Sequence, residues 1–172
     1  MLLPMSSRNA LFGLIILAAL LLPGAASAQM VTFIKIIDGD SLLVEAGGRS
    51  MEVRLIGVDA PEFKQEYGLQ AKEFSLKFCF GHKLRLEFDK ELVDRYGRVL
   101  AYVHRGDKML NREILEAGLA IAVRIKPNIR RYAAFKAAEQ LAVGKKHGFW
   151  KQGGLRMTPA QWRKAHPQKR RD

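Results

Sequence analysis

The sequence predicts an α+β fold in which about five short strands form a small barrel and about three α-helices pack against it. Short runs rich in β-branched and aromatic residues alternate with glycine-containing turns, which is typical of antiparallel strands. Other segments carry apolar residues at helical spacing. A helix after the third strand, with more strands and then helices following it, favours a closed or partly closed barrel of the OB type.

Tight turns join the first three predicted strands. The runs at 31–37 and 41–45 flank Asp38-Gly39-Asp40, and a D-G pair between two such runs is a strong hairpin signal. After a second glycine turn, residues 51–55 alternate as a third strand. We therefore expect a three-stranded meander. Further strands are predicted at 83–88 and 99–103.

Three helices are expected after this meander. The first follows a loop at 60–68 and ends before Gly81. The second begins with Asn111 as its N-cap and ends at Gly118, because short polar side chains cap helix starts and glycine terminates helices. The third spans about 129–143, where apolar residues recur at helical spacing.

The N-terminus has the features of a secretory signal peptide, predicted over residues 1–28. An apolar run at 11–22 precedes Ala26-Ser27-Ala28, a small-x-small cleavage site. This run is shorter than the about 20 residues that span a bilayer. We therefore expect an exported protein, periplasmic or secreted, with an uncleaved membrane anchor as the alternative. Residues 29–151 are long enough for one domain with its own core.

The charge balance indicates a polyanionic partner. The chain has 29 Lys and Arg against 17 Asp and Glu, a net charge of +12, which attracts nucleic acid or an anionic membrane surface. Residues 152–172 are predicted to be a loosely attached basic tail, in which Thr158-Pro159 can start one short helix. Membrane contact is expected only through an uncleaved leader or this tail.

Cysteine and histidine indicate neither a disulfide framework nor a zinc site. Cys79 is the only cysteine, so an intramolecular disulfide is excluded, and we expect it to be a small buried apolar residue. The four histidines are scattered, without the spacing of metal ligands.

Three segments carry the residue types that phosphodiester cleavage needs. The reaction requires carboxylates that hold a hard cation, a group that orients or deprotonates water, and cations that meet the charge on the phosphate oxygens. The candidates are 38–40 (D-G-D), 54–62 (R-L-I-G-V-D-A-P-E) and 94–102 (D-R-Y-G-R-V-L-A-Y). Each alone is as consistent with a turn or a solvated loop, but all three in order are far more specific.

Together these segments resemble the staphylococcal nuclease (thermonuclease) family, whose hallmarks are D-G-D-[ST], R…V-D-[TA]-P-E and D-[KR]-Y-G-R-x-L-A-Y. The resemblance covers about residues 31–150. It implies an OB-fold domain of the nuclease type and an exported, calcium-dependent endonuclease that hydrolyses phosphodiester bonds of DNA and RNA. In this mechanism water attacks phosphorus with metal assistance, and two arginines stabilise the transition state.

The resemblance also implies a metal site. Asp40 and Asp59 match the metal-binding carboxylates, and the backbone carbonyl of Ala60 matches a further ligand. Ca²⁺ accepts six to eight such oxygen ligands, waters included. Glu62 matches the residue that deprotonates or orients the attacking water, two roles that the residue type leaves open.

The remaining site residues are assigned in the same way. Arg54 and Arg98 match the guanidinium groups that clamp the phosphate, for which a forked donor suits better than lysine. Asp38 matches an acid that orients the site, and Tyr96 a tyrosine near the phosphate. Ser41 keeps the hydroxyl of the family's commoner threonine.

Two features depart from the family. Val123 and Ile125 replace the two tyrosines that line the nucleotide pocket of the type protein, so weaker base stacking is expected. The loop after Glu62 is several residues shorter, so access of long or double-stranded substrate can differ.

Two other functions fit parts of the sequence. A catalytically inactive OB-fold module that only binds nucleic acid fits the charge, but it has no need for clustered acids facing a polyanion. A basic periplasmic scaffold or adhesion domain would dock its tail on anionic lipid. The predicted partners are DNA and RNA substrates, with no stable protein partner and a monomeric chain.

Overall fold

A computed structural model describes residues 28–167 of the chain. The predicted signal peptide, but for its last residue, and the basic cluster at 169–171 lie outside the described residues. No helix between residues 28 and 167 combines the length and the apolar character needed to cross a membrane.

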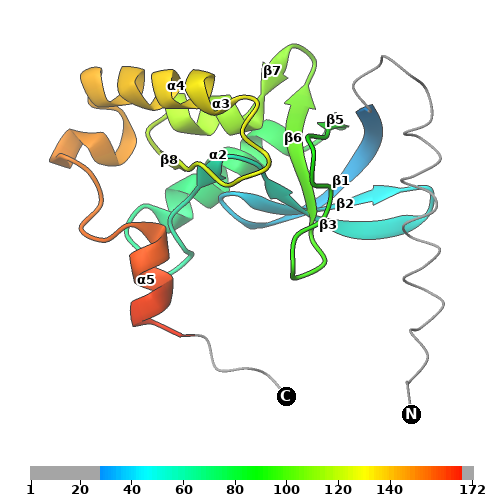
Figure 1. The fold of residues 1–172 in the computed structure, drawn as a ribbon, viewed down its shortest axis with the longest axis horizontal. Helices are drawn as coiled ribbons and strands as arrows, with labels where there is room; N and C mark the ends of the chain where they lie inside the picture. Colours follow the sequence, from blue (N-terminus) through cyan, green and yellow to red (C-terminus); the bar gives the residue numbers. More distant parts are fainter. Residues whose placement is uncertain (1–27, 168–172) are drawn as a thin grey trace.

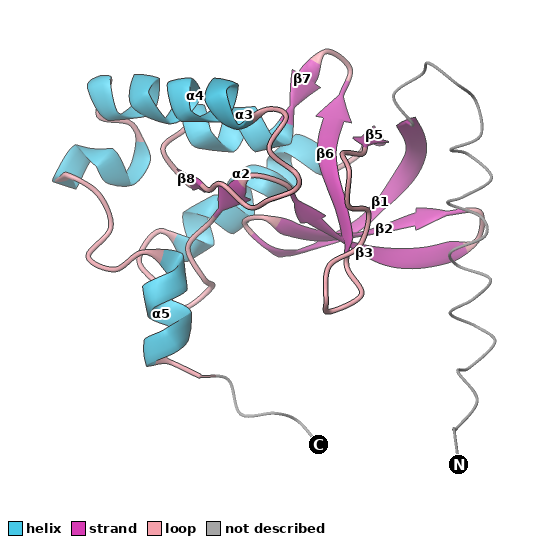
Figure 2. Ribbon diagram, viewed as in Figure 1, coloured by secondary structure: helices cyan, strands magenta, loops and turns pink. Residues whose placement is uncertain are grey.

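Five strands form a closed barrel, as the sequence predicts. Antiparallel pairing runs in the order β3-β2-β1-β5-β6, and a parallel pairing between β3 and β6 closes the ring. Figures 1 and 2 show the curved sheet on one side of the molecule and most of the helices on the other. The barrel strands are β1 (Ala28–Asp38), β2 (Ser41–Ala46), β3 (Arg49–Leu55), β5 (Lys83–Glu87) and β6 (Val99–Arg105).

Three short strands lie outside the barrel ring. Strand β7 (Lys108–Met109) extends β6 as a hairpin, while β4 (Val58–Asp59) pairs with β8 (Ile121–Ala122). The β4–β8 pair matters for function because it fixes Asp59 opposite Ile121.

Four α-helices lie within the described residues, one more than the three that the sequence predicts. The fourth is the short helix that Thr158-Pro159 signals, whose start carries a capping box. The helices are α2 (Gly68–Cys79), α3 (Leu110–Glu116), α4 (Tyr132–Gly144) and α5 (Pro159–Ala165), with a 3₁₀ turn η1 at Gly148–Gln152.

One core joins the barrel to the helices. Tyr102 of β6 and Phe135 of α4 are both buried and meet edge to face, with ring centroids 5.8 Å apart. Cys79 is fully buried, as expected for a small apolar residue. The helical layer is therefore packed directly on the strands that carry the site.

The prediction that Asn111 caps the second helix is wrong. Helix α3 starts at Leu110, and Met109 precedes it without a side-chain cap. Asn111 is instead completely buried: its Oδ1 accepts from the N–H of Val103 at 3.0 Å, and its Nδ2 donates to the carbonyl of Ile56 at 2.9 Å. A buried amide that satisfies two backbone groups ties the turn after β3 to β6.

Helix α4 begins at Tyr132, three residues later than predicted. The residues before it bind the loop after β5 instead of continuing the helix. Asn128 accepts from the N–H of Glu91 at 2.8 Å and donates to its carbonyl at 2.7 Å. Within the predicted helix, the N–H of Arg130 also donates to Asp89 at 3.3 Å, so this segment is held by the loop after β5.

Candidate active site

The predicted D-G-D turn joins β1 to β2, with Asp38 opposite Ser41 in the ladder. A Cβ on Gly39 would lie 2.7 Å from that of Ala60 and 2.8 Å from that of Ala71. Glycine is therefore required because the turn packs directly on β4 and α2. The hydroxyl of Ser75 in α2 donates to the carbonyl of Gly39 at 2.6 Å and fixes the turn.

Asp40 is held in the barrel wall by three protein donors. Its Oδ1 accepts from the Ser41 hydroxyl at 3.2 Å, and its Oδ2 accepts from the Ala60 N–H at 2.7 Å and from Arg54 at 3.0 Å. The N–H of Asp40 donates to Asp38 at 3.1 Å. Burial raises the pKa of Asp40 to about 6, against the lowering effect of Arg54.

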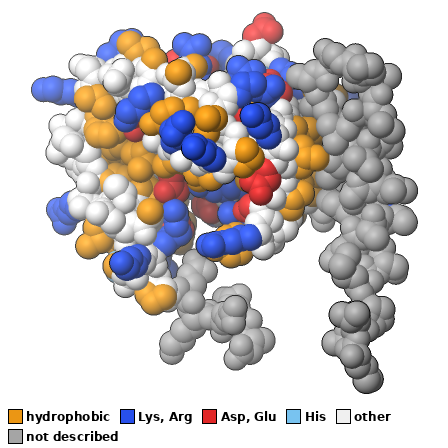
Figure 3. All heavy atoms as spheres, in the orientation of Figure 1, with side chains coloured by type: hydrophobic (Ala, Val, Ile, Leu, Met, Phe, Trp, Pro, Cys, Tyr) orange, Lys and Arg blue, Asp and Glu red, His pale blue; other side chains and the backbone are white. Residues whose placement is uncertain are grey.

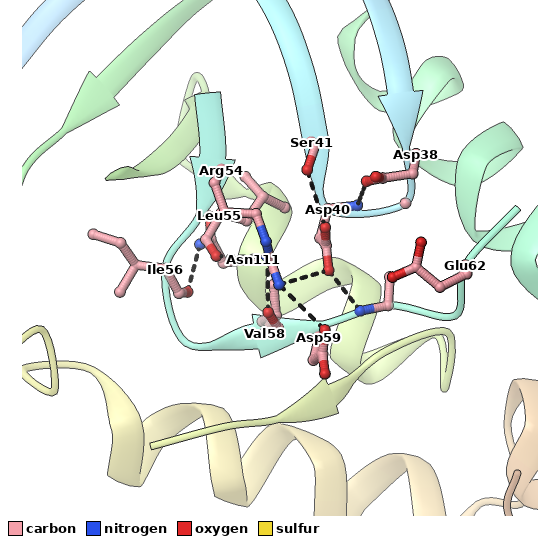
Figure 4. Close-up of polar contacts among 12 residues, drawn as sticks. Asp38, Asp40, Ser41, Arg54, Leu55, Ile56, Val58, Asp59, Glu62 and Asn111 are labelled. Carbon is pink, nitrogen blue, oxygen red and sulfur yellow. Dashed lines mark hydrogen bonds and ion pairs between the residues drawn. The ribbon is translucent and has the colours of Figure 1, made fainter. Parts of the chain in front are cut away.

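Arg54 bridges the two predicted metal ligands. Its Nη2 lies 3.0 Å from Oδ2 of Asp40 and 3.2 Å from Oδ1 of Asp59, so both carboxylates converge on one point (Figure 4). Its Nη1 donates to the carbonyls of Leu55 and Val58 at 3.0 and 2.9 Å. The guanidinium thus holds the β3–β4 turn in place while it neutralises the acid pair.

Asp59 is almost completely buried, at 3% exposure. Burial raises its pKa, a hydrogen bond from Arg163 opposes the rise, and the charge of Asp40 adds to it. Two buried acids this close repel each other when both are ionised, so they need a cation between them.

The acid pair fits a hard cation such as Ca²⁺. Both acids offer carboxylate oxygens, which are hard ligands, and they already attract guanidinium groups. Burial raises the pKa of each acid, and a bound cation would offset that cost of ionisation. Over residues 28–167, no cluster of three or more His, Cys, Asp or Glu has a metal-binding arrangement. A cation here would therefore have two side-chain ligands, and backbone carbonyls or waters would complete its shell.

Glu62 lies in the loop that leads from β4 to α2, close to the acid pair (Figure 4). Its side chain is 24% exposed. Its carbonyl accepts from the N–H of Gln65 at 2.8 Å, and a Cβ on Gly68 would come within 1.9 Å of that carbonyl. The tight loop therefore presents the Glu62 carboxylate at the mouth of the site.

Arg163 is the site residue that the sequence analysis missed. It comes from α5, within the segment interpreted as a loosely attached tail. Its Nη1 lies 3.0 Å from Oδ1 of Asp59 and 2.8 Å from Oε1 of Glu62, and its Nη2 lies 3.0 Å from Oδ2 of Asp59. The capping signal at Thr158 predicted the helix, but nothing in the sequence indicates where it docks.

Arg98 immediately precedes β6, which pairs with the β3 strand that carries Arg54. Its guanidinium pairs with Asp94 at 2.8 Å and lies 4.0 Å from Glu52. Burial raises the pKa of Asp94, but hydrogen bonds from Arg98 lower it more. Tyr96, which is 68% exposed, packs its ring 5.4 Å from the Arg98 guanidinium.

The structure thus gathers most, but not all, of the predicted site residues. Arg98 and Tyr96 stand apart, since no hydrogen bond or ion pair among the described residues joins them to the acid pair. Figure 3 shows a hollow on this face with Asp and Glu side chains in it and Lys and Arg side chains around it. The residues brought together are Asp38, Asp40, Ser41, Arg54, Asp59, Ala60 and Glu62.

Comparison with known proteins covers most of this architecture. Residues 52–152 match the family model described as staphylococcal nuclease homologue. A thermonuclease of Staphylococcus hyicus is 37% identical over 131 residues, 73% of this chain and 78% of that protein. A thermonuclease of Staphylococcus intermedius is 38% identical over 122 residues, 67% of this chain and 73% of that protein. Endonuclease YncB of Bacillus subtilis (strain 168) is 37% identical over 132 residues, 72% of this chain and 63% of that protein.

Proposed function

This chain belongs to the staphylococcal nuclease family, and we propose that it is an exported, calcium-dependent nuclease that cuts both DNA and RNA. That it is a nuclease, hydrolysing phosphodiester bonds, follows from its thermonuclease and endonuclease relatives. One observation carries the metal assignment: a single nitrogen of Arg54 lies within 3.2 Å of two buried carboxylates, Asp40 in the β1–β2 turn and Asp59 in β4. Two carboxylates this close can bind a hard cation, which prefers oxygen ligands.

Asp40 and Asp59 would hold the calcium ion, and the Ala60 carbonyl would be a further ligand. The N–H of Ala60 already donates to Asp40, which places this residue beside the acid pair. A bound calcium ion would polarise the phosphate and help to form the attacking hydroxide. Asp38 and Ser41 orient Asp40 through its N–H and its Oδ1.

Glu62 would orient or deprotonate the attacking water. It is the more exposed carboxylate beside the acid pair, so water reaches it while Asp40 and Asp59 stay buried. Proton transfer needs a base within hydrogen-bond reach of the water, and the loop position of Glu62 allows this. Its ion pair with Arg163 must open first.

Arg54 and Arg98 would stabilise the charge that develops on the phosphate oxygens. Arg54 already faces the acid pair, while Arg98 approaches from the neighbouring strand and is oriented by Asp94. Forked donors that are fixed before the reaction stabilise such charge without reorganisation. Tyr96 packs on Arg98 and would lie near the same phosphate.

We propose that the protein binds the bases of its nucleic-acid substrate only weakly. Val123 is half-buried and Ile125 is 61% exposed, and neither offers an aromatic face for stacking. Since stacking contributes about 1–3 kcal/mol per base in single-strand binders, affinity would rest mainly on phosphate contacts. Broad action on DNA and RNA agrees with this.

A chelation-controlled assay tests the proposal. The purified chain without its leader should degrade plasmid DNA and RNA in Ca²⁺ and stop when the chelator EGTA is added. Arg98→Ala should lower the rate on the order of 100-fold, as removal of one charge-stabilising donor does. Arg112→Ala is the matched control, because this arginine is exposed on α3 and pairs only with Glu116 within the described part of the chain. A rate that is unchanged by EGTA would refute the calcium assignment.

A further inference from the structure

Arg163 binds the same carboxylates that the proposed function assigns to calcium and to water. Both oxygens of Asp59 are engaged by its guanidinium in a bidentate pair, each at 3.0 Å. The same guanidinium lies 2.8 Å from Oε1 of Glu62. One side chain from the C-terminal helix therefore covers both a proposed metal ligand and the proposed water-activating group.

Helix α5 is seated over the site by specific contacts in the preceding segment. Gln65 Nε2 donates to the carbonyl of Met157 at 2.7 Å, and Glu66 accepts from the N–H of Arg156 at 2.6 Å. Pro159, the first residue of α5, is buried. Gln65 and Glu66 belong to the Glu62 loop, so the helix docks on the loop whose carboxylate it covers. All these anchors involve residues beyond position 152, where the family match ends.

Helix α5 can leave the site without leaving Asp59 unpaired. Arg163 is 47% exposed, so solvent reaches its guanidinium although Asp59 itself is buried. Helix α5 has seven residues, and short terminal segments open with small free-energy costs. When Arg163 leaves, Arg54 still lies 3.2 Å from Oδ1 of Asp59, and Oδ2 of Asp59 becomes available to another cation.

Two cations cannot occupy the same lone pairs of Asp59. A calcium ion needs a carboxylate oxygen at about 2.3–2.6 Å, in the region where the Arg163 nitrogens now lie. We propose that Arg163 is a tethered cation that competes with calcium for Asp59, so that docking of α5 and metal loading exclude each other. This inference rests on the proposed function and adds regulation to it: the docked chain is inhibited until calcium displaces the helix.

Calcium binding tests the inference without reference to activity. The affinity of the full chain without its leader is measured by isothermal titration calorimetry for wild type, Arg163→Gln and Lys164→Gln. Arg163→Gln should bind Ca²⁺ about tenfold more tightly, the change expected if the wild type is docked about nine-tenths of the time. Lys164→Gln removes the same charge from the next position. It should leave affinity within about twofold, because Lys164 makes no ion pair among residues 28–167.

A second measurement uses the wild type alone. Because coupling between two binding events is reciprocal, Ca²⁺ should release α5, and amide hydrogen exchange at 160–166 should speed up on calcium addition. Unchanged affinity in Arg163→Gln together with unchanged exchange would overturn the inference while the nuclease proposal stands. Absence of calcium binding in every variant would overturn both. Weaker nucleotide binding in Arg163→Gln at unaltered calcium affinity would instead place Arg163 in the phosphate clamp.

Discussion

Asp40, Asp59 and Glu62 are three acids within one site, yet their surroundings differ. Burial raises the pKa of the first two, which are enclosed by the barrel wall and β4. Glu62 stays partly exposed on its loop. Residues of the same chemical type thus divide into a cation-binding pair and a carboxylate that water can reach, because the backbone places them at different depths.

The role proposed for Glu62 can be tested with a neutral side chain of the same size. Glu62→Gln keeps the size and one acceptor oxygen but replaces the other oxygen with an amide donor and removes the base, so the rate in Ca²⁺ should fall about 100-fold or more. Circular dichroism should show an unchanged fold. Glu73→Gln is the control, because Glu73 is exposed on α2 and undergoes the same chemical change. Activity of Glu62→Gln equal to that of Glu73→Gln would remove Glu62 from the mechanism.

At the scale of elements, a few buried polar side chains fix how strands and helices meet. Asn111 ties α3 to the turn after β3. Glu87 of β5 accepts from Arg131 at 2.7 and 2.9 Å and from Arg130 at 2.9 Å, which joins the barrel to the segment before α4. Such contacts fix the arrangement of the elements that surround the site.

The Glu87 contacts predict a pH dependence of stability. Burial raises the pKa of Glu87, but the arginines lower it more, so it lies below its ordinary value of 4.5. A depressed carboxyl pKa stabilises the fold above about pH 4.5, and this is lost as the pH falls through the folded-state pKa. Urea unfolding should show Glu87→Gln less stable by about 1–3 kcal/mol at pH 7.

That difference between Glu87→Gln and wild type should shrink as the pH falls below about 4.5, because the wild-type carboxylate then takes up its proton. Glu45→Gln is the control, because Glu45 is exposed on β2. A difference that stays constant as the pH falls would show that the effect comes from packing and not from the ion pairs.

At the scale of the whole molecule, charge decides how substrate approaches. The chain carries a net charge of +12, and Figure 3 shows a hollow with Asp and Glu side chains in it and Lys and Arg side chains around it. Long-range attraction therefore brings the polyanion to a site whose centre is acidic and needs a cation of its own.

Binding of single-stranded DNA should weaken steeply with salt. We expect log affinity against log salt concentration to have a slope of about −0.7 or steeper, since the clamped phosphate contributes about −0.7 and any further phosphate contact adds to it. Fluorescence anisotropy of a labelled oligonucleotide on Glu62→Gln, in Ca²⁺, measures binding without cleavage. An uncharged peptide nucleic acid of the same sequence should show no such slope. A flat response for DNA would mean that phosphate contacts do not carry the affinity.

The sequence alone predicted the barrel and the meander of its first three strands, and it singled out Asp40 and Asp59. Hairpin turns and strand alternation are local patterns. The turn at Asp38-Gly39-Asp40 is predicted from its own residues, because a D-G pair favours the backbone conformation of a tight hairpin turn. The family motifs assigned Asp40, Asp59 and Glu62 in the same way. The positions of Asn111 and Arg163 were decided only by the tertiary structure. Their partners lie 55 and 104 positions away in the chain, and no local pattern records contacts over such separations.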